Sequence, residues 1–293
     1  MKSPKIEEPL LESAPLAWRL APQLCNRDTG NGEDCSAMHG AWQYLRALGL
    51  VGSIDQRADF YREALAPVAE AATTPSILVC GAADYAMLAQ IVAAFRGRNV
   101  EPDVTVIDLC ETPLMLNRWY ADRAACRIKT VREDVLKYGA AFPYDAICTD
   151  AFLGRFAPAR RPALLAKWRS LLRPGGRIIT ASRLRAGGAA DPVRFSAEQV
   201  QRLHASVLSL AGKMRGSLQV DPVELADRAA AFAGSHVTYP VGSAEETRAL
   251  FEGAGFRLDR FKVAAIAPET QNLSGGPSLR KAGEYLYICA SRA

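Results

Sequence analysis

Acidic residues at the ends of short apolar runs indicate the chemistry that this chain can support. They are Asp108 after Val104–Ile107, Glu133 and Asp134 after Ile128–Val131, and Asp150 after Tyr144–Thr149. Runs of this composition predict strands that are buried on both faces of a parallel sheet. Ligands of such sheets bind at the carboxyl ends of the strands, where these carboxylates lie. A carboxylate that closes a strand, as Asp108 does, can accept two hydrogen bonds from the diol of a ribose.

A turn of small residues completes this pattern. Ser76–Cys80 is a further apolar run, and Gly81, Ala82 and Ala83 follow it, which lets the backbone approach a ligand closely. The turn GAADYA lacks the second and third glycines of G-x-G-x-x-G, which admit a pyrophosphate. Gly81 and Asp108 are 27 positions apart, whereas the comparable spacing in dinucleotide folds is about 20. These differences favour a nucleoside without phosphates over NAD, and S-adenosylmethionine is such a nucleoside.

The elements that position these residues alternate between strand and helix. After the first strand, apolar residues recur at helical spacing from Met87 to Phe95. Similar units continue up to the breaker Arg173-Pro174-Gly175-Gly176, so that five strand–helix units lie between about 74 and 183. Runs at 256–265 and 285–290 predict two closing strands. The sequence therefore predicts an α/β fold: a doubly wound, mostly parallel, seven-stranded sheet with an antiparallel closing hairpin.

Two further segments are predicted to be helical. Residues 1–73 form an N-terminal helical cap, in which the proline-rich residues 1–30 are expected to be extended or broken-helical and helices follow over 36–72. Residues 184–247 form a helical insertion on the substrate side of a Rossmann-like domain, 74–293. Because caps and loops vary while a sheet is retained, we expect substrate specificity to reside in these two segments. Loops are predicted at 26–35, at 187–190 and around 274–277.

The composition is that of an ordinary globular enzyme, with 49% hydrophobic and 23% charged residues among 293. The net charge of +5 is spread along the chain. Its densest basic stretch, 155–177, is interpreted as a solvated helix face, with nucleic-acid contact as the alternative. Seven cysteines without C-x-x-C pairs favour a reducing cytoplasm over a disulfide framework. With no 18-residue apolar run and no signal-peptide core, we expect a soluble cytoplasmic protein and no membrane partner.

The core resembles the class I S-adenosylmethionine-dependent methyltransferases over roughly 74–183, and over the closing hairpin, 254–291, by pattern. The segments that carry the resemblance are ILVCGAADYAML, VTVIDLCETPL, VREDVL, YDAICTDAFLG and LLRPGGRIITA. The last of these is the most specific, because a helix that ends in L-L-R-P-G-G before an apolar strand recurs across that family. Where the family usually has G-x-G-x-G, this chain has GAADYA, which we interpret as a tolerated variant. The helices over 36–72 resemble the cap of members that act on small molecules.

The resemblance implies a site for S-adenosylmethionine, with S-adenosylhomocysteine as the product. Gly81, Ala82 and Ala83 would face the methionine part of the cofactor, and Asp108 would bind the ribose hydroxyls. The other cofactor-binding positions would be Leu109 after that acid, Glu133, Asp134 and Val135 around the adenine, and Asp150, Ala151 and Phe152 beside the sulfonium and the acceptor. Three of these acids have a structural alternative. Asp134 can be a helix N-cap, Asp150 can cap the following turn, and Asp108 can be a purely structural acid.

A base is needed for transfer to most oxygen or nitrogen acceptors, but an activated carbon or a thiolate can react without one. The candidates are His236, in the loop after the inserted helices, His39, at the head of the capping helix, and Asp150. Each histidine has the alternative of a hydrogen-bonded structural residue, and His204 is interpreted as a surface or packing residue. No H-x-E, H-E-x-x-H or paired-cysteine pattern indicates a metal. We expect methyl transfer to an O, N, C or S atom of a small metabolite, and a homodimer is left open.

Three other functions stay open on the sequence alone. A nucleic-acid or protein methyltransferase is one, although TDAF after the fourth strand is not the N-P-P-Y-like tetrad of amino-group targets. A protein of the same fold that binds S-adenosylmethionine without methylating is another. An oxidoreductase is the third, and the missing glycines argue against it.

Overall fold

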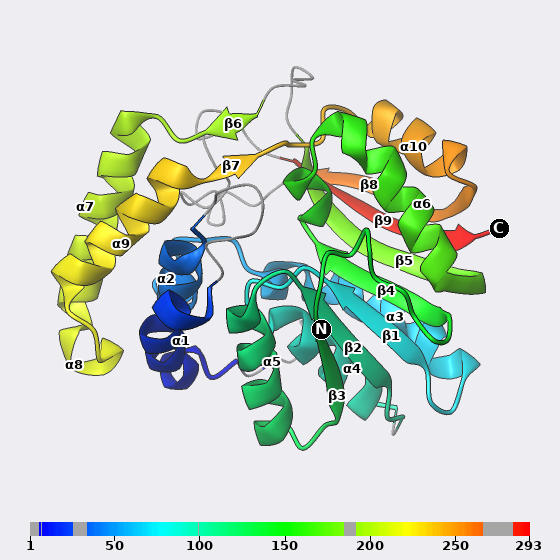
Figure 1. The fold of residues 1–293 in the computed structure, drawn as a ribbon, viewed down its shortest axis with the longest axis horizontal. Helices are drawn as coiled ribbons and strands as arrows, with labels where there is room; N and C mark the ends of the chain where they lie inside the picture. Colours follow the sequence, from blue (N-terminus) through cyan, green and yellow to red (C-terminus); the bar gives the residue numbers. More distant parts are fainter. Residues whose placement is uncertain (1–5, 7, 26–33, 99, 185–191, 266–283) are drawn as a thin grey trace.

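A computed structural model describes residues 6, 8–25, 34–98, 100–184, 192–265 and 284–293. Its centre is a seven-stranded sheet in the order β3-β2-β1-β4-β5-β9-β8 (Figure 1). The strands are β1 (Ser76–Cys80), β2 (Asp103–Asp108), β3 (Ile128–Arg132), β4 (Tyr144–Asp150), β5 (Leu172–Leu184), β8 (Phe256–Ala265) and β9 (Glu284–Arg292). β1 to β5 are parallel, and β9 runs antiparallel to both β5 and β8. The predicted doubly wound sheet with an antiparallel closing hairpin is confirmed.

Both faces of the sheet are covered by helices, which is why the inner strands β1 and β4 are apolar and buried. In β1, Ile77 and Val79 face one apolar cluster, and Leu78 and Cys80 face another. The first cluster contains α3 (Ala58–Ala71), α4 (Ala86–Arg96) and α5 (Glu111–Arg123), and the second contains α6 (Arg161–Leu171) and α10 (Ala244–Gly253). Successive residues of a strand point to opposite faces, so one short run serves both layers.

The fifth strand begins before the predicted breaker Arg173-Pro174-Gly175-Gly176 rather than after it. β5 starts at Leu172 and pairs Tyr144 with Leu172, and the register then shifts so that Ala146 pairs with Arg177. Gly175 has φ +74°, a conformation that glycine adopts without steric cost. The segment R-P-G-G is therefore an irregularity within the strand, not a loop before it.

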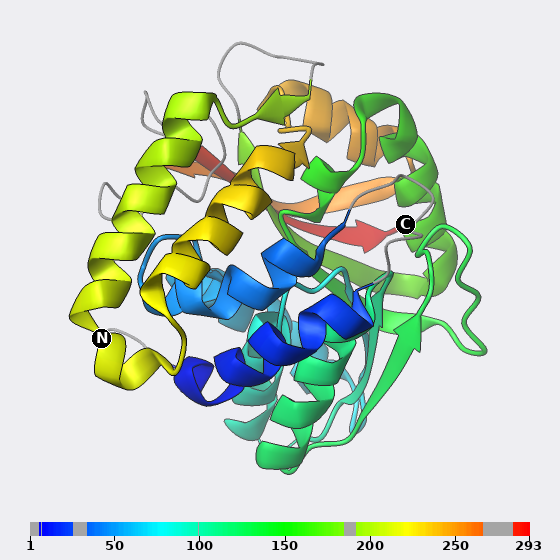
Figure 2. The ribbon, with the colours of Figure 1, turned by 60° about the vertical axis from the view of Figure 1, so that its left-hand side comes forward.

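Four helices stand together beyond the carboxyl ends of the parallel strands (Figures 1 and 2). They are α1 (Leu10–Leu24), α2 (Ser36–Ala47), α7 (Ala197–Lys213) and α9 (Pro222–Ser235). Their apolar side chains form one cluster that includes Tyr44, Leu45, Val207 and Phe232. The N-terminal segment and the insertion, far apart in sequence, thus form a single helical cover over the ligand-binding end of the sheet.

The expectation of an extended or broken N-terminal segment is wrong, because α1 is a continuous helix that contains Pro15 and Pro22. Its face of small residues, Ala14, Ala17 and Ala21, is fully buried. Burial of this face against the helical cover and the sheet outweighs the hydrogen bonds that the two prolines remove. The predicted helix at 55–72 is present as η1 (Ile54–Arg57) followed by α3, which packs on the sheet with α4 rather than with the cover.

The remaining short elements lie in the connections between these helices and strands. They are η2 (Phe152–Arg155), η3 (Pro158–Arg160), α8 (Arg215–Leu218) and the two-stranded ribbon β6 (Val193–Arg194) and β7 (Val237–Thr238). The predicted loops at 187–190 and 274–277, and most of that at 26–35, lie outside the described residues. Among the helices that are described, none is long and apolar enough to cross a membrane.

Candidate cofactor site

Asp108 joins the two turns that follow β1 and β2. One carboxylate oxygen accepts the backbone N–H of Ala82 at 2.9 Å, and the other accepts that of Cys110 at 2.8 Å. Burial raises the pKa of this carboxyl to about 6, and the nearby His39 and the two backbone donors act in the opposite direction. A carboxylate offers about four lone-pair positions. The two lone-pair positions that the backbone leaves free fit a pair of ribose hydroxyls. These acceptors therefore suit a nucleoside.

Gly81 has a conformation and an environment that only glycine satisfies. Its φ is +69°, and a Cβ there would lie 2.2 Å from Cε2 of Phe152. The Phe152 ring, which begins η2 after β4, stacks on Trp168 with centroids 6.2 Å apart. The turn after β1 and the turn after β4 are therefore in direct contact, and Ala83 lies half-buried beside them.

The positions expected around an adenine have contrasting environments. Leu109 is a large apolar residue that is 48% exposed, while Val135 is buried. Asp134 accepts the backbone N–H of Leu136 at 2.9 Å through Oδ1, which stabilises a turn; no helix begins here, so it is not the helix N-cap considered as its alternative role. Glu133 donates its own backbone N–H to the carbonyl of Asp108 at 3.1 Å. This loop therefore lies beside Asp108 and near the exposed apolar side chain of Leu109.

Asp150 is held by two residues that precede the sheet in sequence. Arg57 donates to it from Nε at 3.0 Å and from Nη2 at 2.6 Å, and the Tyr61 hydroxyl donates at 2.7 Å. Burial raises the pKa of Tyr61 well above its ordinary range, so the phenol remains a donor. The next residue, Ala151, has φ +54° and donates its N–H to Ala181 at 2.8 Å. The acid after β4 is thus engaged by the N-terminal segment.

A second buried ion pair links the cover to the GAADYA turn. Arg46 of α2 donates to Asp84 at 2.6 Å and also pairs with Glu8. Asp84 in turn caps α4 by accepting the N–H of Ala86 at 2.9 Å. Burial raises the pKa of Glu8 to about 7, against the opposing effect of Arg46. Neither Arg46 nor Arg57 was singled out by sequence reasoning, because nothing in a helical segment marks which cation will meet a strand end.

The three histidines lie in different environments. His236 ends α9 and packs between Phe195 and Phe232, with ring centroids 6.1 and 5.0 Å away, and burial together with Arg155 lowers its pKa to about 4. His204 pairs with Asp227 at 3.0 Å at the surface, as the sequence suggested. His39 is buried beside Cys25, with Nδ1 3.3 Å from Sγ. Burial alone would lower the pKa of His39, but hydrogen bonding to Cys110 and Cys25 raises it to about 10.

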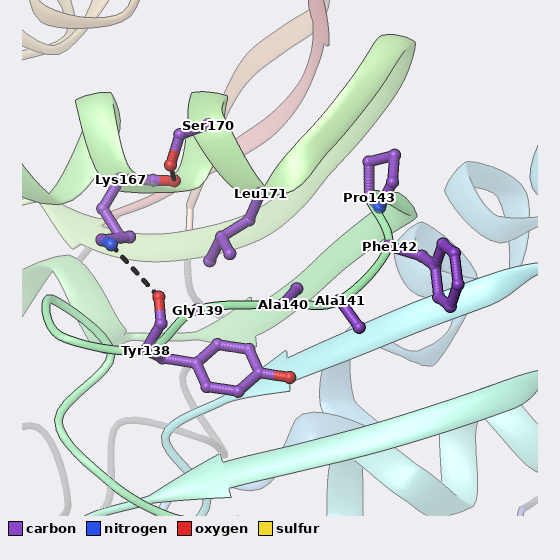
Figure 3. Close-up of a pocket in the computed structure, with 9 residues that line it drawn as sticks. All are labelled: Tyr138, Gly139, Ala140, Ala141, Phe142, Pro143, Lys167, Ser170 and Leu171. Carbon is purple, nitrogen blue, oxygen red and sulfur yellow. Dashed lines mark hydrogen bonds between the residues drawn. The ribbon is translucent and has the colours of Figure 1, made fainter.

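A pocket of about 430 Å³ lies elsewhere, at the amino end of β4 (Figure 3). Tyr138 to Pro143 line one side, and Lys167, Ser170 and Leu171 of α6 line the other. Lys167 donates to the Tyr138 carbonyl at 3.1 Å across it. Since ligands of parallel sheets bind at the opposite, carboxyl ends of the strands, this pocket is not part of the cofactor site.

Comparison with known proteins gives the fold a class. No family profile matches the sequence, and no curated protein matches it. Among solved structures, the magnesium protoporphyrin IX methyltransferase of Synechocystis PCC 6803, solved with bound S-adenosylhomocysteine, is 12% identical with a TM-score of 0.52. The match covers 91% of this chain and 100% of that one. A putative sarcosine dimethylglycine methyltransferase from Galdieria sulphuraria is 11% identical over 81% and 85% of the two chains, with a TM-score of 0.51. The [4+2]-cyclase SpnF is 13% identical over 82% of each chain, with a TM-score of 0.50.

The chain therefore has the fold of the class I S-adenosylmethionine-dependent methyltransferases. At this level of identity the likeness concerns the fold. It includes the SpnF cyclase, so one fold accommodates more than one reaction.

Proposed function

We propose that this chain is an S-adenosylmethionine-dependent methyltransferase that acts on a small metabolite. The observation that carries the proposal is Asp108. It stands at the end of β2, next to β1 in the sheet. It accepts the backbone N–H of Ala82 in the turn after β1 and has acceptor positions left for a ribose. The cofactor set that we propose around it consists of Gly81, Ala82, Ala83, Leu109, Glu133, Asp134, Val135, Asp150, Ala151 and Phe152.

When bound, S-adenosylmethionine supplies a methyl group that its sulfonium already activates. The residues of the chain bind and align the reactants. Asp108 would hold the ribose, and Leu109 would cover one face of the adenine. The helical cover excludes water from the carboxyl ends of the strands, which favours an in-line approach in a defined geometry.

A small acceptor is favoured over a nucleic acid because four of the seven cations in the dense basic stretch, 155–177, make internal contacts. Its bonds are Arg155 to the Val237 carbonyl, Arg161 to the carbonyls of Leu153, Phe156, Tyr239 and Pro240, Lys167 to that of Tyr138, and Arg173 to the carboxylate of Asp145. Cations engaged in this way are poorly placed to release counterions from a phosphate backbone. The seven cysteines are free thiols, which favours a reducing compartment such as the cytoplasm.

The proposed base is His236, for acceptors that must lose a proton. Its imidazole is neutral at pH 7, as a base must be, and the lowered pKa makes it a weak base that would need the developing charge of the acceptor complex to hold a proton. Asp150 is proposed to position the acceptor as a fixed anion, since Arg57 and Tyr61 already donate to it. His39 is directed toward the cysteines around Cys25 and is a weaker candidate for contact with an acceptor.

The first test is calorimetric titration of the purified full chain with S-adenosylmethionine, S-adenosylhomocysteine and NADH. Micromolar binding of the first two, with no binding of NADH, supports the cofactor assignment. Incubation with S-adenosylmethionine and pools of candidate metabolites then separates the functions, because a methyltransferase forms S-adenosylhomocysteine with an acceptor. A product that forms while S-adenosylmethionine is not consumed would instead support a non-methylating enzyme of the same fold, in which the SpnF cyclase is another reaction type.

A further inference from the structure

Three cysteines and a histidine, distant in sequence, converge next to the proposed cofactor site. Cys25 ends α1, Cys35 and His39 belong to the first turn of α2, and Cys110 lies between β2 and α5. One potential ligand atom from each side chain lies within 4.8 Å of all the others. No motif search would find this set, because its members come from three elements and form no paired-cysteine pattern.

The spacing within the set matches a tetrahedral metal site. Zinc–sulfur bonds of about 2.3 Å and zinc–nitrogen bonds of about 2.0 Å at tetrahedral angles place two sulfurs about 3.8 Å apart and a sulfur and a nitrogen about 3.6 Å apart. The Sγ atoms of Cys25 and Cys110 are 3.5 Å apart, those of Cys35 and Cys110 are 3.7 Å apart, and Cys25 Sγ is 3.3 Å from His39 Nδ1. A disulfide needs sulfurs about 2.05 Å apart. These three separations match those of ligands around one ion, and the remaining pairs lie within 4.8 Å.

The surroundings favour a soft metal and thiolate ligands. Cys25, His39 and Cys110 are buried, and Cys35 is half-buried. Cys35 and Cys110 are the N-cap residues of α2 and α5, where the helix dipole stabilises a negative sulfur. The Thr112 hydroxyl lies 3.2 Å from Cys25 Sγ, so it can donate a hydrogen bond to a metal-bound thiolate.

We propose that Cys25, Cys35, His39 and Cys110 bind one zinc ion in a closed, four-ligand structural site. The Cys₃His set is a common structural zinc donor set, and its four protein ligands leave no open position for catalysis. Cys35 and His39 are four residues apart on α2, so both reach the ion from one face of the helix.

The position of the site gives it a role. Cys110 donates its backbone N–H to Asp108 at 2.8 Å, and the other ligands come from α1 and α2. The ion therefore fastens the N-terminal part of the helical cover to the strand end that carries the proposed ribose acid. Loss of the metal should loosen both the cover and the loop that contains Leu109.

The test is the metal content of the full-length protein, expressed with zinc and desalted. We expect about one zinc per wild-type chain, near-complete loss in Cys35→Ser, and full retention in Cys126→Ser. Cys126 is the matched control, because it is also half-buried and lies outside the cluster. Thr112→Val removes only the hydrogen bond to Cys25 and should weaken zinc binding about tenfold or more in a competition with a chelator.

A measurement on the wild type alone covers the case in which Cys35→Ser does not fold. Apoprotein prepared with a thiol-directed reagent and reduced should take up one Co²⁺, with the charge-transfer and intense d–d absorption of tetrahedral cobalt thiolates. Zinc should displace the cobalt and raise the melting temperature. Wild-type protein that holds no more zinc than Cys35→Ser and gives only octahedral cobalt spectra would overturn the proposal. A disulfide between Cys25 and Cys110 in freshly purified protein would overturn it as well.

Discussion

The guanidinium of Arg57 donates two hydrogen bonds to the carboxylate of Asp150, from Nε to Oδ1 at 3.0 Å and from Nη2 to Oδ2 at 2.6 Å. Both side chains are largely buried, with 4% and 12% of their surfaces exposed. The pair connects η1, before the sheet begins, to the end of β4. A two-bond, charge-assisted contact of this kind fixes orientation as well as adding energy. Arg57, which precedes the sheet in sequence, therefore helps to orient the Asp150 side chain at the end of β4.

Breaking this ion pair should cost substantial stability. Arg57→Met leaves Asp150 with the Tyr61 hydroxyl but without a cation, and we expect the free energy of unfolding to fall by about 3 kcal/mol. Urea denaturation followed by circular dichroism measures the change. The control is Arg62→Met, which removes a solvent-exposed pair with Asp59 and should cost less than about 1 kcal/mol. Equal losses in the two variants would show that the Asp150 pair adds nothing beyond a surface contact.

Asp108 should decide whether the cofactor binds. Asp108→Ala removes the charged acceptors of the ribose hydroxyls, so the dissociation constant for S-adenosylhomocysteine should rise about tenfold or more. Asp108→Asn retains the shape and one acceptor oxygen and should lie between the alanine variant and the wild type. Calorimetry at fixed pH gives all three constants. Asp103→Asn, at the exposed start of the same strand, is the control and should bind as the wild type does. If Asp108→Ala keeps its fold by circular dichroism and binds with unchanged affinity, the ribose does not bind at Asp108.

Gly81 should not tolerate a side chain. Gly81→Ala places a methyl group 2.2 Å from Phe152 at a φ of +69°, so we expect a loss of stability of about 1–3 kcal/mol. The matched control is Gly212→Ala within α7, where nothing lies within 4 Å of the added carbon and φ is ordinary. That change should be neutral or stabilising by up to about 1 kcal/mol.

The double variant Gly81→Ala with Phe152→Ala tests the cause of that loss. If the contact with the ring dominates, the two changes together should cost less than the sum of the single changes. Strict additivity would assign the whole effect to the backbone conformation of Gly81.

His236 should make stability depend on pH. Its pKa is about 4 in the folded protein, because of burial and Arg155, and about 6.5 when unfolded. Since the folded value is the lower one, the unfolded chain binds more protons between these limits. Stability should therefore rise from pH 4 to pH 6.5 and be fully present above that, with a contribution from His236 of about 1–3 kcal/mol.

Denaturation midpoints of the wild type and His236→Gln across this range measure that contribution. The difference in stability between the two proteins should be largest above pH 6.5 and shrink on acidification. His204→Gln is the control, because His204 lies at the surface beside Asp227. A difference between wild type and His236→Gln that stays constant from pH 4 to pH 8 would contradict the lowered pKa.

The sequence by itself determined the sheet. The sequence runs predicted the residue bounds of β1, and those of β2, β3, β4, β8 and β9 to within a few residues. For the inner strands the reason is that burial on both faces leaves few alternatives in composition. Asp108 could be placed at the ligand edge because it directly follows a predicted strand, and ligands bind at the carboxyl ends of parallel strands.

The tertiary structure decided what lies over that edge. Pro15 and Pro22 predict a broken segment, but the burial of a small-residue face overrides them and makes α1 continuous. The packing of helices that are distant in sequence decides which acids pair with Arg57 and Arg46. The same packing brings together Cys25, Cys35, His39 and Cys110. Local pattern encodes which face of an element is buried, but it does not encode the partner against which that face packs, because that pairing is set by packing of the whole chain.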